Sequence, residues 1–217
     1  MRFRSVAKDT LARIGPFPAR VVESEPMLFR ADWDFAMSNG GTITMLFLDA
    51  IKDVVPRDSV VIDSRSHMLM RGWFPCIPGW HHDDVRRTGP NGQPDYENQG
   101  YHSRHLMCVV DALDQPTEAL TEFMIGNIDV PWPVPDGTNV YSTWDAYLNT
   151  MSAKPRIIQV KSGQIVDFDA HAFHRGVPAK YTGWRFFIRL TTDTGIKPEN
   201  KIRKNANVYL PAVSNGW

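Results

Sequence analysis

Prolines and glycines interrupt this chain along its whole length, and they limit it to short helices and strands. Sixteen prolines and 15 glycines are spread over 217 residues, without a Gly/Ser linker, an internal repeat or a low-complexity tract. Proline ends helices and is poorly tolerated inside central strands, while glycine favours turns. The pattern therefore favours many short strands joined by turns, and the length suits one domain.

Two segments have helical periodicity, and most of the remaining apolar runs have the length of strands. Thr42 to Val55 carries an apolar face at helical spacing and stops at Pro56. Ser142 to Ser152 begins with Ser-Thr-Trp-Asp, the pattern of a capping box, and ends before Pro155. The predicted strands are Ser59 to Asp63, Ser66 to Met70, Leu106 to Val110, Arg156 to Val160, Gln164 to Phe168 and Trp184 to Thr192.

These elements predict an α+β chain that is mainly β, with an antiparallel sandwich or barrel core and a few flanking helices. Lys161-Ser162-Gly163 separates two predicted strands and indicates a hairpin. Val85 to Tyr101 is different, because it has almost no apolar residues and is rich in glycine, proline and asparagine. We expect a long loop there, and such loops are often lids or binding loops.

Composition and charge exclude several classes of protein. The 24 Lys and Arg residues balance 24 Asp and Glu residues, which argues against a strongly basic nucleic-acid wrapper but allows a local basic patch. No run of 18 apolar residues predicts a membrane span, and no apolar segment follows the basic start to predict a secretory signal. Cys76 and Cys108 are too few for a disulfide framework, so we expect buried thiols and a cytoplasmic location.

The chemistry of the chain is concentrated in a few side chains that follow one another in a defined order. His81 and Asp83 are two residues apart, so on an extended chain both point to the same side. His174 follows a predicted strand, Arg185 comes eleven residues later, and Arg189 lies on the same strand face as Arg185. Two imidazoles and one carboxylate form the facial triad that suits non-haem Fe(II). An arginine fork can hold a carboxylate with two parallel hydrogen bonds.

This arrangement resembles that of the Fe(II)/2-oxoglutarate-dependent dioxygenase superfamily, whose pattern is His-x-Asp, a long gap, a distal His and an Arg about ten residues on. The resemblance covers roughly Pro75 to Thr192. It implies a double-stranded β-helix, a cupin-like jelly roll, forming a single domain over residues 1–217. It also implies Fe(II) bound by His81, Asp83 and His174 as the catalytic centre, with the far carboxylate of the cosubstrate 2-oxoglutarate on Arg185. The implied reaction is O₂-dependent hydroxylation of a C–H bond, with release of succinate and CO₂.

Two assignments within this site have alternatives. His82 and Asp84 form an equally valid His-x-Asp pair, and we prefer His81 and Asp83 because Trp80 supplies the aromatic residue that often precedes the first ligand in this family. Arg189 is predicted to bind an anionic group of the substrate. Its alternative is a salt bridge to an acidic neighbour such as Asp193 or Asp167.

None of the other histidines is predicted to be a metal ligand. His171 is predicted at the surface or next to the metal ligands, His102 and His105 at the pocket rim or in solvent, and His67 as a structural residue on a strand.

The sequence does not identify the substrate or the binding partners. A basic stretch formed by Lys197, Lys201, Arg203 and Lys204 reads as a solvated tail or strand edge, with a phosphate-binding patch as the alternative. Free amino acids, nucleobases, nucleic acids, peptides and lipids are all allowed as substrates, and the oligomeric state is not predicted. Two other functions fit the pattern: a cupin-type metal enzyme that does not use 2-oxoglutarate, and a non-catalytic β-sandwich binding module.

Overall fold

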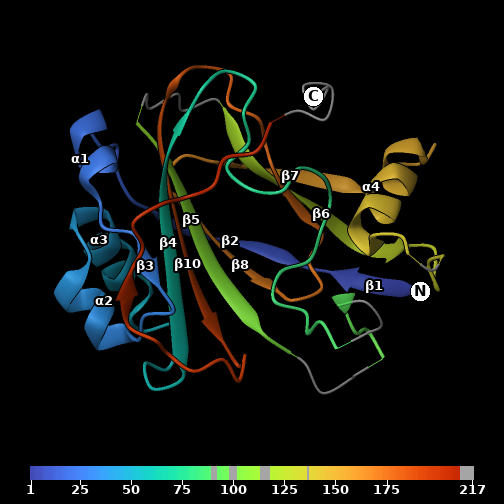
Figure 1. Ribbon diagram of the computed structural model, residues 1–217, viewed down its shortest axis with the longest axis horizontal. Coiled ribbons are helices and arrows are strands. Elements are labelled where there is room, and N and C mark those ends of the chain that lie inside the picture. The colour runs from blue at the N-terminus through green and yellow to red at the C-terminus, as the bar shows by residue number, and fades with distance from the viewer. Residues whose placement is uncertain (89–91, 98–101, 113–117, 136, 211–217) are drawn as a thin grey trace.

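Two antiparallel β-sheets, stacked face to face, form the centre of the computed structural model, which describes residues 1–88, 92–97, 102–112, 118–135 and 137–210 (Figure 1). The helices are α1 (Ala19–Ser24), α2 (Trp33–Asn39), α3 (Thr42–Ile51) and α4 (Val140–Thr150). The strands are β1 (Arg2–Ser5), β2 (Ala7–Arg13), β3 (Leu28–Phe29), β4 (Val60–Leu69), β5 (Arg104–Asp111), β6 (Ala119–Asp129), β7 (Arg156–Lys161), β8 (Gln164–Asp169), β9 (His174–Gly176), β10 (Gly183–Thr192) and β11 (Lys201–Ile202).

The strand order defines the two layers of this sandwich. One sheet has the order β2-β8-β5-β10-β4, and the other has the order β1-β6-β7 with β9 also paired to β6. A small third sheet joins β3 to β11. Every strand pair among the described residues is antiparallel. The mainly β class with few helices, predicted from the sequence, is confirmed.

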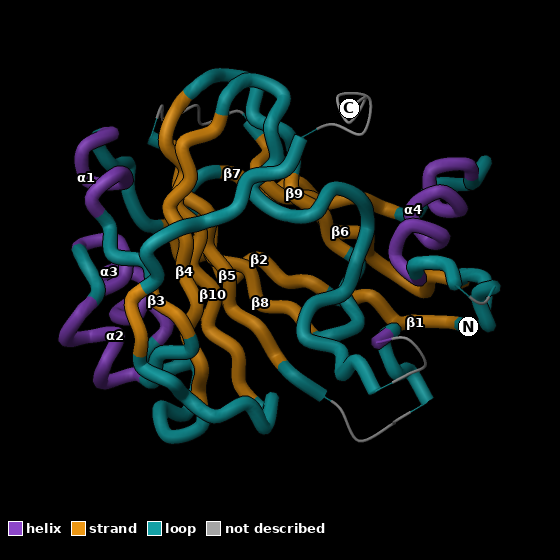
Figure 2. Tube along the Cα trace, viewed as in Figure 1, coloured by secondary structure: helices purple, strands orange, loops and turns teal. Residues whose placement is uncertain are grey.

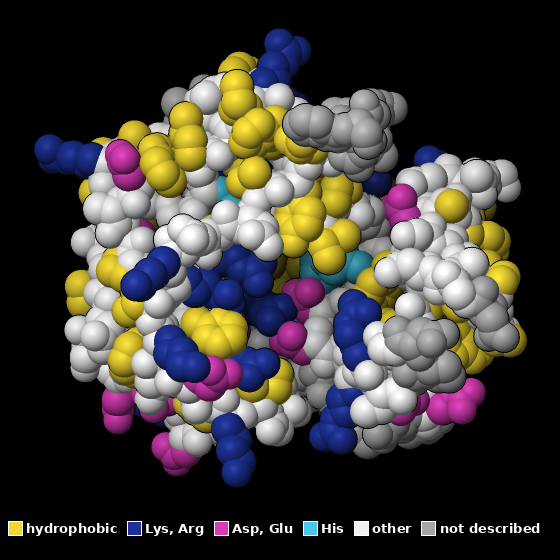
Figure 3. All heavy atoms as spheres, viewed as in Figure 1, with side chains coloured by type: hydrophobic (Ala, Val, Ile, Leu, Met, Phe, Trp, Pro, Cys, Tyr) yellow, Lys and Arg dark blue, Asp and Glu magenta, His cyan; other side chains and the backbone are white. Residues whose placement is uncertain are grey.

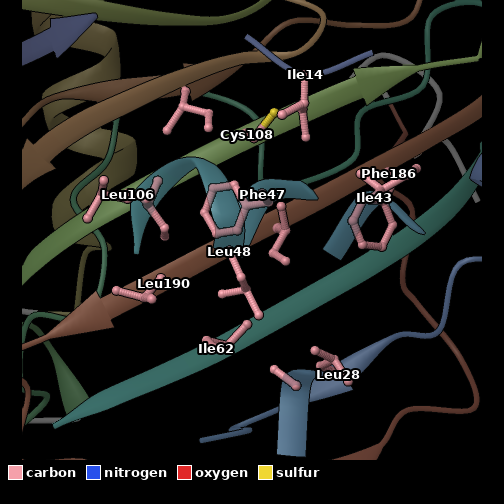
Figure 4. Packing of buried hydrophobic residues seen from close by; sticks show 14 of the residues in the cluster. Ile14, Leu28, Ile43, Phe47, Leu48, Ile62, Leu106, Cys108, Phe186 and Leu190 are labelled. Carbon is pink, nitrogen blue, oxygen red and sulfur yellow. The ribbon is translucent and has the colours of Figure 1, made fainter. Parts of the chain in front are cut away.

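Alternation along β10 separates the apolar core from the functional face of the larger sheet. Phe186, Ile188 and Leu190 are fully buried and pack with Phe47 and Leu48 of α3 (Figure 4). The residues between them face the second sheet, because side chains of a strand point alternately to its two sides. Arg185 and Arg189 therefore share one face, as their spacing predicted.

Helices cover the outer sides of the sandwich, so the molecule has the layer order helices, sheet, sheet, helix (Figure 2). Trp144 of α4 packs against Phe3, Met124 and Ile128 of the smaller sheet. Apolar side chains from both sheets fill the space between them: Met107, Val109, Leu120, Phe123, Val160, Val166 and Phe168. No helix in the described part of the chain is long and apolar enough to cross a membrane.

The segment Lys161-Ser162-Gly163 connects the two sheets and does not close the predicted hairpin. β7 pairs with β6, whereas β8 pairs with β2 and β5 in the other sheet. Gly163 has a φ of +78°, and a Cβ added to it would lie 2.0 Å from the carbonyl oxygen of Ile14. The glycine that suggested a two-strand turn is therefore required by a close backbone approach at the corner between the sheets.

Several predicted elements have different bounds in the structure. The predicted strands Ser59 to Asp63 and Ser66 to Met70 form the single strand β4. α3 ends at Ile51, before the predicted limit at Val55. α4 begins before Ser142, because the side chain of Asn139 caps it by accepting the backbone N–H of Ser142 at 3.1 Å.

Two helices were not predicted, because each is short. α1 has six residues and α2 has seven, too few to establish a helical period in the sequence.

Buried Glu25 holds the start of α3 against the end of α1. Its carboxylate accepts the backbone N–H groups of Gly41 at 3.1 Å, Ile43 at 3.1 Å and Thr44 at 2.7 Å. The first N–H groups of a helix have no partner within the helix, and a negative charge there also meets the positive end of the helix dipole. One side chain thus satisfies three backbone donors from another segment.

We predict that Glu25→Ala lowers the free energy of unfolding by about 2–4 kcal/mol, because it removes a cap and leaves buried N–H groups without acceptors. Urea denaturation followed by circular dichroism measures this change. Glu23→Ala is the matched control, since Glu23 is exposed on the same helix, and it should change stability by less than about 0.5 kcal/mol. Equal small effects of the two substitutions would contradict this role of Glu25.

Candidate metal centre

A pair of backbone hydrogen bonds places His81 directly opposite His174. The N–H of His81 donates to the carbonyl of His174 at 3.0 Å, and the N–H of His174 donates to the carbonyl of His81 at 3.1 Å. The centroids of the two imidazole rings are 4.5 Å apart. This isolated antiparallel bridge brings together the two histidines that the sequence places far apart.

Both histidines present the same ring nitrogen to the space between them. The Nδ1 of His81 lies 2.9 Å from the carbonyl of Gly79, and the Nδ1 of His174 lies 2.9 Å from the carbonyl of Ala172. A carbonyl only accepts hydrogen bonds, so each Nδ1 carries the proton and each Nε2 keeps its lone pair for a metal.

Asp83 completes the cluster. Its carboxylate lies 3.3 Å from the Nε2 of His174 and 3.9 Å from the Nε2 of His81. One donor atom from each of the three residues lies within 4.8 Å of the others. Two imidazole nitrogens and one carboxylate on three positions fit a divalent transition metal, so these residues could hold one.

A glycine-tryptophan turn fixes the first two candidate ligands to α4. Gly79 has a φ of +96°, and an added Cβ would lie 2.9 Å from the Asp145 carboxyl carbon. The N–H of Trp80 donates to Asp145 of α4 at 2.9 Å, and the guanidinium of Arg175 lies 4.4 Å from the centre of the Trp80 ring. Trp80 is therefore a buried anchor for the segment that carries His81 and Asp83.

The local electrostatics favour the metal-binding form of these groups. Burial, with the nearby His174 imidazole, lowers the pKa of His81 to about 4, so its ring is neutral at pH 7. Burial alone would raise the pKa of the Asp83 carboxyl, but Arg189 and His174 hold that pKa well below its usual range. A neutral imidazole and an ionised carboxylate are the forms that bind metals.

Arg189 lies beside the cluster and is bound to its carboxylates. Its guanidinium donates to Asp83, and a second nitrogen donates to Asp84 at 2.7 Å. The alternative offered from the sequence, a salt bridge to an acidic neighbour, is therefore present, with Asp83 and Asp84 as partners in place of Asp193 or Asp167. Asp167 pairs with Arg104 at 2.7 Å. Arg189 therefore holds the Asp83 carboxylate in place, and the substrate contact predicted for it stays a prediction.

Arg185 lies on the predicted strand face, but its guanidinium is already paired. It is 4% exposed, donates to Asp111 at 3.1 Å and donates to the carbonyl of Val177 at 3.2 Å. It is also absent from the residues that line the cavity beside the cluster. A carboxylate of 2-oxoglutarate would have to share or replace Asp111 at this guanidinium.

The competing pair, His82 and Asp84, does not form a cluster with His174. His82 points into an aromatic group, with its Nδ1 2.9 Å from the Tyr96 hydroxyl and its ring centroid 4.0 Å from that of Phe173. Burial, with nearby His171, keeps the pKa of His82 well below its ordinary value. The structure thus brings together the preferred residues and uses His82 in packing.

The predicted long loop after the ligands forms neither α-helix nor β-strand in its described residues, 85–88 and 92–97. Residues 89–91 and 98–101 of this loop lie outside the described part of the chain. Tyr96 attaches the loop to the protein, since its hydroxyl donates to the Tyr141 hydroxyl at 3.1 Å and its ring packs against Trp132. Its behaviour as a lid stays a prediction.

A cavity of about 300 Å³ lies beside the cluster, between the two sheets. Apolar walls come from both sheets, including Met107, Val109 and Leu120. Figure 3 shows a hollow on this face in which basic, acidic and histidine side chains meet. The pocket is therefore a mixed site, with charged groups set against an apolar interior.

Sequence reasoning missed the charged residues that β4 contributes to this cavity. Asp63, Arg65 and His67 alternate along the strand and all line the cavity. The signal was present, because three polar residues at a spacing of two on a strand share one face. The predicted strands split β4 at this point, which hid the pattern.

Arg203, from the predicted basic stretch, also lines the cavity, although it was expected in solvent. Its guanidinium donates to Asp63 at 2.6 Å. Lys201 and Lys204 are exposed, as predicted.

Among the other histidines and the cysteines, His105 and Cys76 differ from their predicted positions. His105 is fully buried, not at the rim, and its Nδ1 lies 3.1 Å from Thr191 and 3.9 Å from Asp84. His102 is exposed, and His171 is partly buried. Of the two thiols, Cys108 is fully buried as predicted, whereas Cys76 is partly buried and lines the cavity.

Comparison with known proteins gives only distant similarities. No protein-family model matches the chain, and no curated protein matches it. Among solved structures, EvdMO1 is 17% identical with a TM-score of 0.35, over 70% of this chain and 30% of EvdMO1. AviO1 from Streptomyces viridochromogenes Tue57 is 17% identical with a TM-score of 0.32, over 71% of this chain and 58% of AviO1.

A third similar structure is the nickel complex of ThoJ, described as a non-heme monooxygenase. It is 11% identical with a TM-score of 0.35, over 89% of this chain and 83% of ThoJ. Likeness of this degree defines neither a shared fold nor a shared activity, so the function below rests on the residues of the site.

We predict that Asp83→Asn and His174→Gln each weaken metal binding by more than about 100-fold, because loss of a supporting hydrogen bond alone costs about 10–100-fold. His82→Phe should bind metal within about threefold of the unchanged protein, since His82 packs among aromatic rings and is not a ligand. Anaerobic calorimetric titration with Fe(II), and with Ni(II) as a redox-inert control, measures these affinities. Metal loss in His82→Phe combined with retention in His81→Phe would show that the other pair binds the metal.

Proposed function

We propose that this chain is a non-haem Fe(II)- and 2-oxoglutarate-dependent oxygenase built on a jelly-roll sandwich. In this proposal it hydroxylates a C–H bond of its substrate and releases succinate and CO₂. The observation that carries the proposal is the cluster of His81, Asp83 and His174, whose donor atoms lie within 4.8 Å of one another beside an internal cavity. Three protein ligands leave further coordination positions for a cosubstrate and O₂.

The bound iron and oxo acid would supply the oxidising chemistry, and the protein supplies position and environment. His81 and His174 would hold the metal through Nε2, because backbone carbonyls fix their Nδ1 protons. Arg189 keeps the Asp83 carboxylate ionised and oriented. Apolar side chains such as Met107, Val109 and Leu120 form part of the cavity wall and offer a surface for the apolar part of a substrate.

The charge of the cavity supports an anionic cosubstrate. Arg30, Arg65, Arg189 and Arg203 line it together with three aspartates, and a divalent metal would add two positive charges. By the family resemblance, Arg185 takes the far carboxylate of 2-oxoglutarate. This requires Asp111 to release or share the Arg185 guanidinium, and it requires the cosubstrate to reach a side chain that the present cavity lining does not include.

The Arg185–Asp111 pair favours a second candidate, a metal enzyme of the same sandwich that does not use 2-oxoglutarate. A buried guanidinium needs a carboxylate, and Asp111 already provides one at 3.1 Å. In this case the pair has a structural role, and the three metal ligands act without an oxo acid.

Anaerobic titration of the Fe(II)-loaded protein with 2-oxoglutarate distinguishes the two candidates. Chelation of iron by an oxo acid should give a weak visible charge-transfer band. We predict that Arg185→Gln weakens 2-oxoglutarate binding by at least about 30-fold, because a charged partner is lost, while Fe(II) binding is unchanged. Asp111→Asn is the matched variant, and it should strengthen 2-oxoglutarate binding because it frees the guanidinium.

A contrary result has a defined meaning. If Fe(II) binds but 2-oxoglutarate gives no band, the second candidate holds. If the band forms but Arg185→Gln and Asp111→Asn leave the affinity for 2-oxoglutarate unchanged, another residue holds the far carboxylate and the role given to Arg185 falls.

A further inference from the structure

Arg65 is a cavity cation without a counter-ion among the described residues. It lies on β4, opposite Phe187 of β10, and its side chain has neither an ion pair nor a hydrogen bond in the described part of the chain. The other arginines of the cavity wall are all paired: Arg30 with Glu199, Arg189 with Asp83 and Asp84, and Arg203 with Asp63. Arg65 is therefore the guanidinium available for a ligand.

Its position connects the cavity to an adjoining surface groove. Arg65 lines both spaces, as do His81 and Asp83 of the metal centre. The outer walls of the groove include Ile77, Val85, Arg87, Tyr141 and Ile196. A molecule in this groove therefore lies beside both Arg65 and the candidate metal ligands.

His67 provides a second polar group on the same strand face. It is 2% exposed and lines the cavity. The backbone of Asn207 interacts with one ring nitrogen outside strict hydrogen-bond geometry, which leaves at least the other nitrogen without a partner among the described residues. Burial, with the nearby Arg65 and Arg185 charges, lowers the pKa of His67 to about 4, so the ring is neutral at pH 7. A buried ring nitrogen without a partner is costly unless a ligand uses it.

Arg65 is the one arginine among the described lining residues that has no carboxylate partner. The charges of the wall as a whole balance, because Arg30 pairs with Glu199, Arg203 pairs with Asp63, and Arg189 faces both Asp83 and Asp84. A divalent metal and a dianionic oxo acid would cancel each other, so Arg65 attracts an anion through its local position and not through a net charge of the site.

We propose that Arg65, assisted by the imidazole of His67, binds an oxyanion of the prime substrate, a carboxylate or a phosphate. That the bound anion belongs to a substrate rests on the proposed function. The oxyanion site itself rests only on Arg65 and His67. A guanidinium offers two parallel N–H donors that match both oxyanions. The anchored group lies at the passage between groove and cavity, so the rest of the molecule extends toward the metal.

Titration of the Zn(II)-loaded protein with inorganic phosphate, and separately with acetate, tests this site in the presence of saturating 2-oxoglutarate. Zn(II) is redox-inert, and ¹⁵N-labelled protein lets the amide shifts of Arg65, His67 and Phe187 report binding. We expect saturable shifts in the unchanged protein, at least tenfold weaker binding in Arg65→Gln, and partial retention in Arg65→Lys. Arg71→Gln is the control, since Arg71 is exposed just beyond the end of β4, and it should bind both anions normally. The anion that binds with the higher affinity identifies the chemical group of the substrate.

Two results would overturn the inference. One is equal binding of both anions by the unchanged protein and Arg65→Gln, or no binding by either. The other is loss of 2-oxoglutarate affinity in Arg65→Gln, which would make Arg65 a cosubstrate residue. The failure of the proposed function is visible separately: if 2-oxoglutarate does not bind but phosphate or acetate binding depends on Arg65, with or without metal, the oxyanion site stands and the 2-oxoglutarate proposal falls.

Discussion

The candidate metal centre depends on two backbone hydrogen bonds between His81 and His174. These bonds join a segment anchored on α4 to the short strand β9, and they align the two imidazole rings across the end of the sandwich. Closing such a long chain segment costs conformational entropy, which the packed sheets on either side must offset. Trp80, Asp145 and Gly79 supply the local part of this support. The rest of the fold holds these two ligands at a fixed separation.

The carboxylates and guanidinium groups around the centre form a layered charge arrangement. Arg189 pairs with both Asp83 and Asp84 next to the proposed metal, and Arg185 of the same strand pairs with Asp111. Arg65 lies between them on β4 and has no such partner in the described residues. One face of the sheet therefore carries two paired guanidinium groups, Arg185 and Arg189, and one that is available, Arg65. In the proposals, 2-oxoglutarate binds Arg185 and the oxyanion of the substrate binds Arg65.

Local sequence patterns predicted a large part of this structure. The shared side of His81 and Asp83 and the shared face of Arg185 and Arg189 follow from the two-residue period of extended chains, whereas the order of the proposed ligands comes from the family resemblance. The apolar run of β10 also reads directly from the sequence.

Long-range geometry accounts for what the sequence did not predict. The pairing of Arg185 with Asp111 depends on the register of β10 against β5, and the corner at Gly163 depends on the approach of Ile14 from the other end of the chain. His82 and His81 are adjacent, and only the three-dimensional packing of Phe3 and Phe173 shows which ring faces the cluster. Arg203 reaches the cavity because β11 pairs with β3, a contact between distant segments that no local pattern indicates.

A crystal structure of the metal-loaded protein, with anomalous scattering recorded at the metal edge, tests the central claim most directly. The account predicts one metal ion about 2.0–2.2 Å from the Nε2 atoms of His81 and His174 and from a carboxylate oxygen of Asp83. Arg189 should remain on Asp84 in that structure. A metal bound by His82 or Asp84, or an anomalous peak distant from His174, would contradict it.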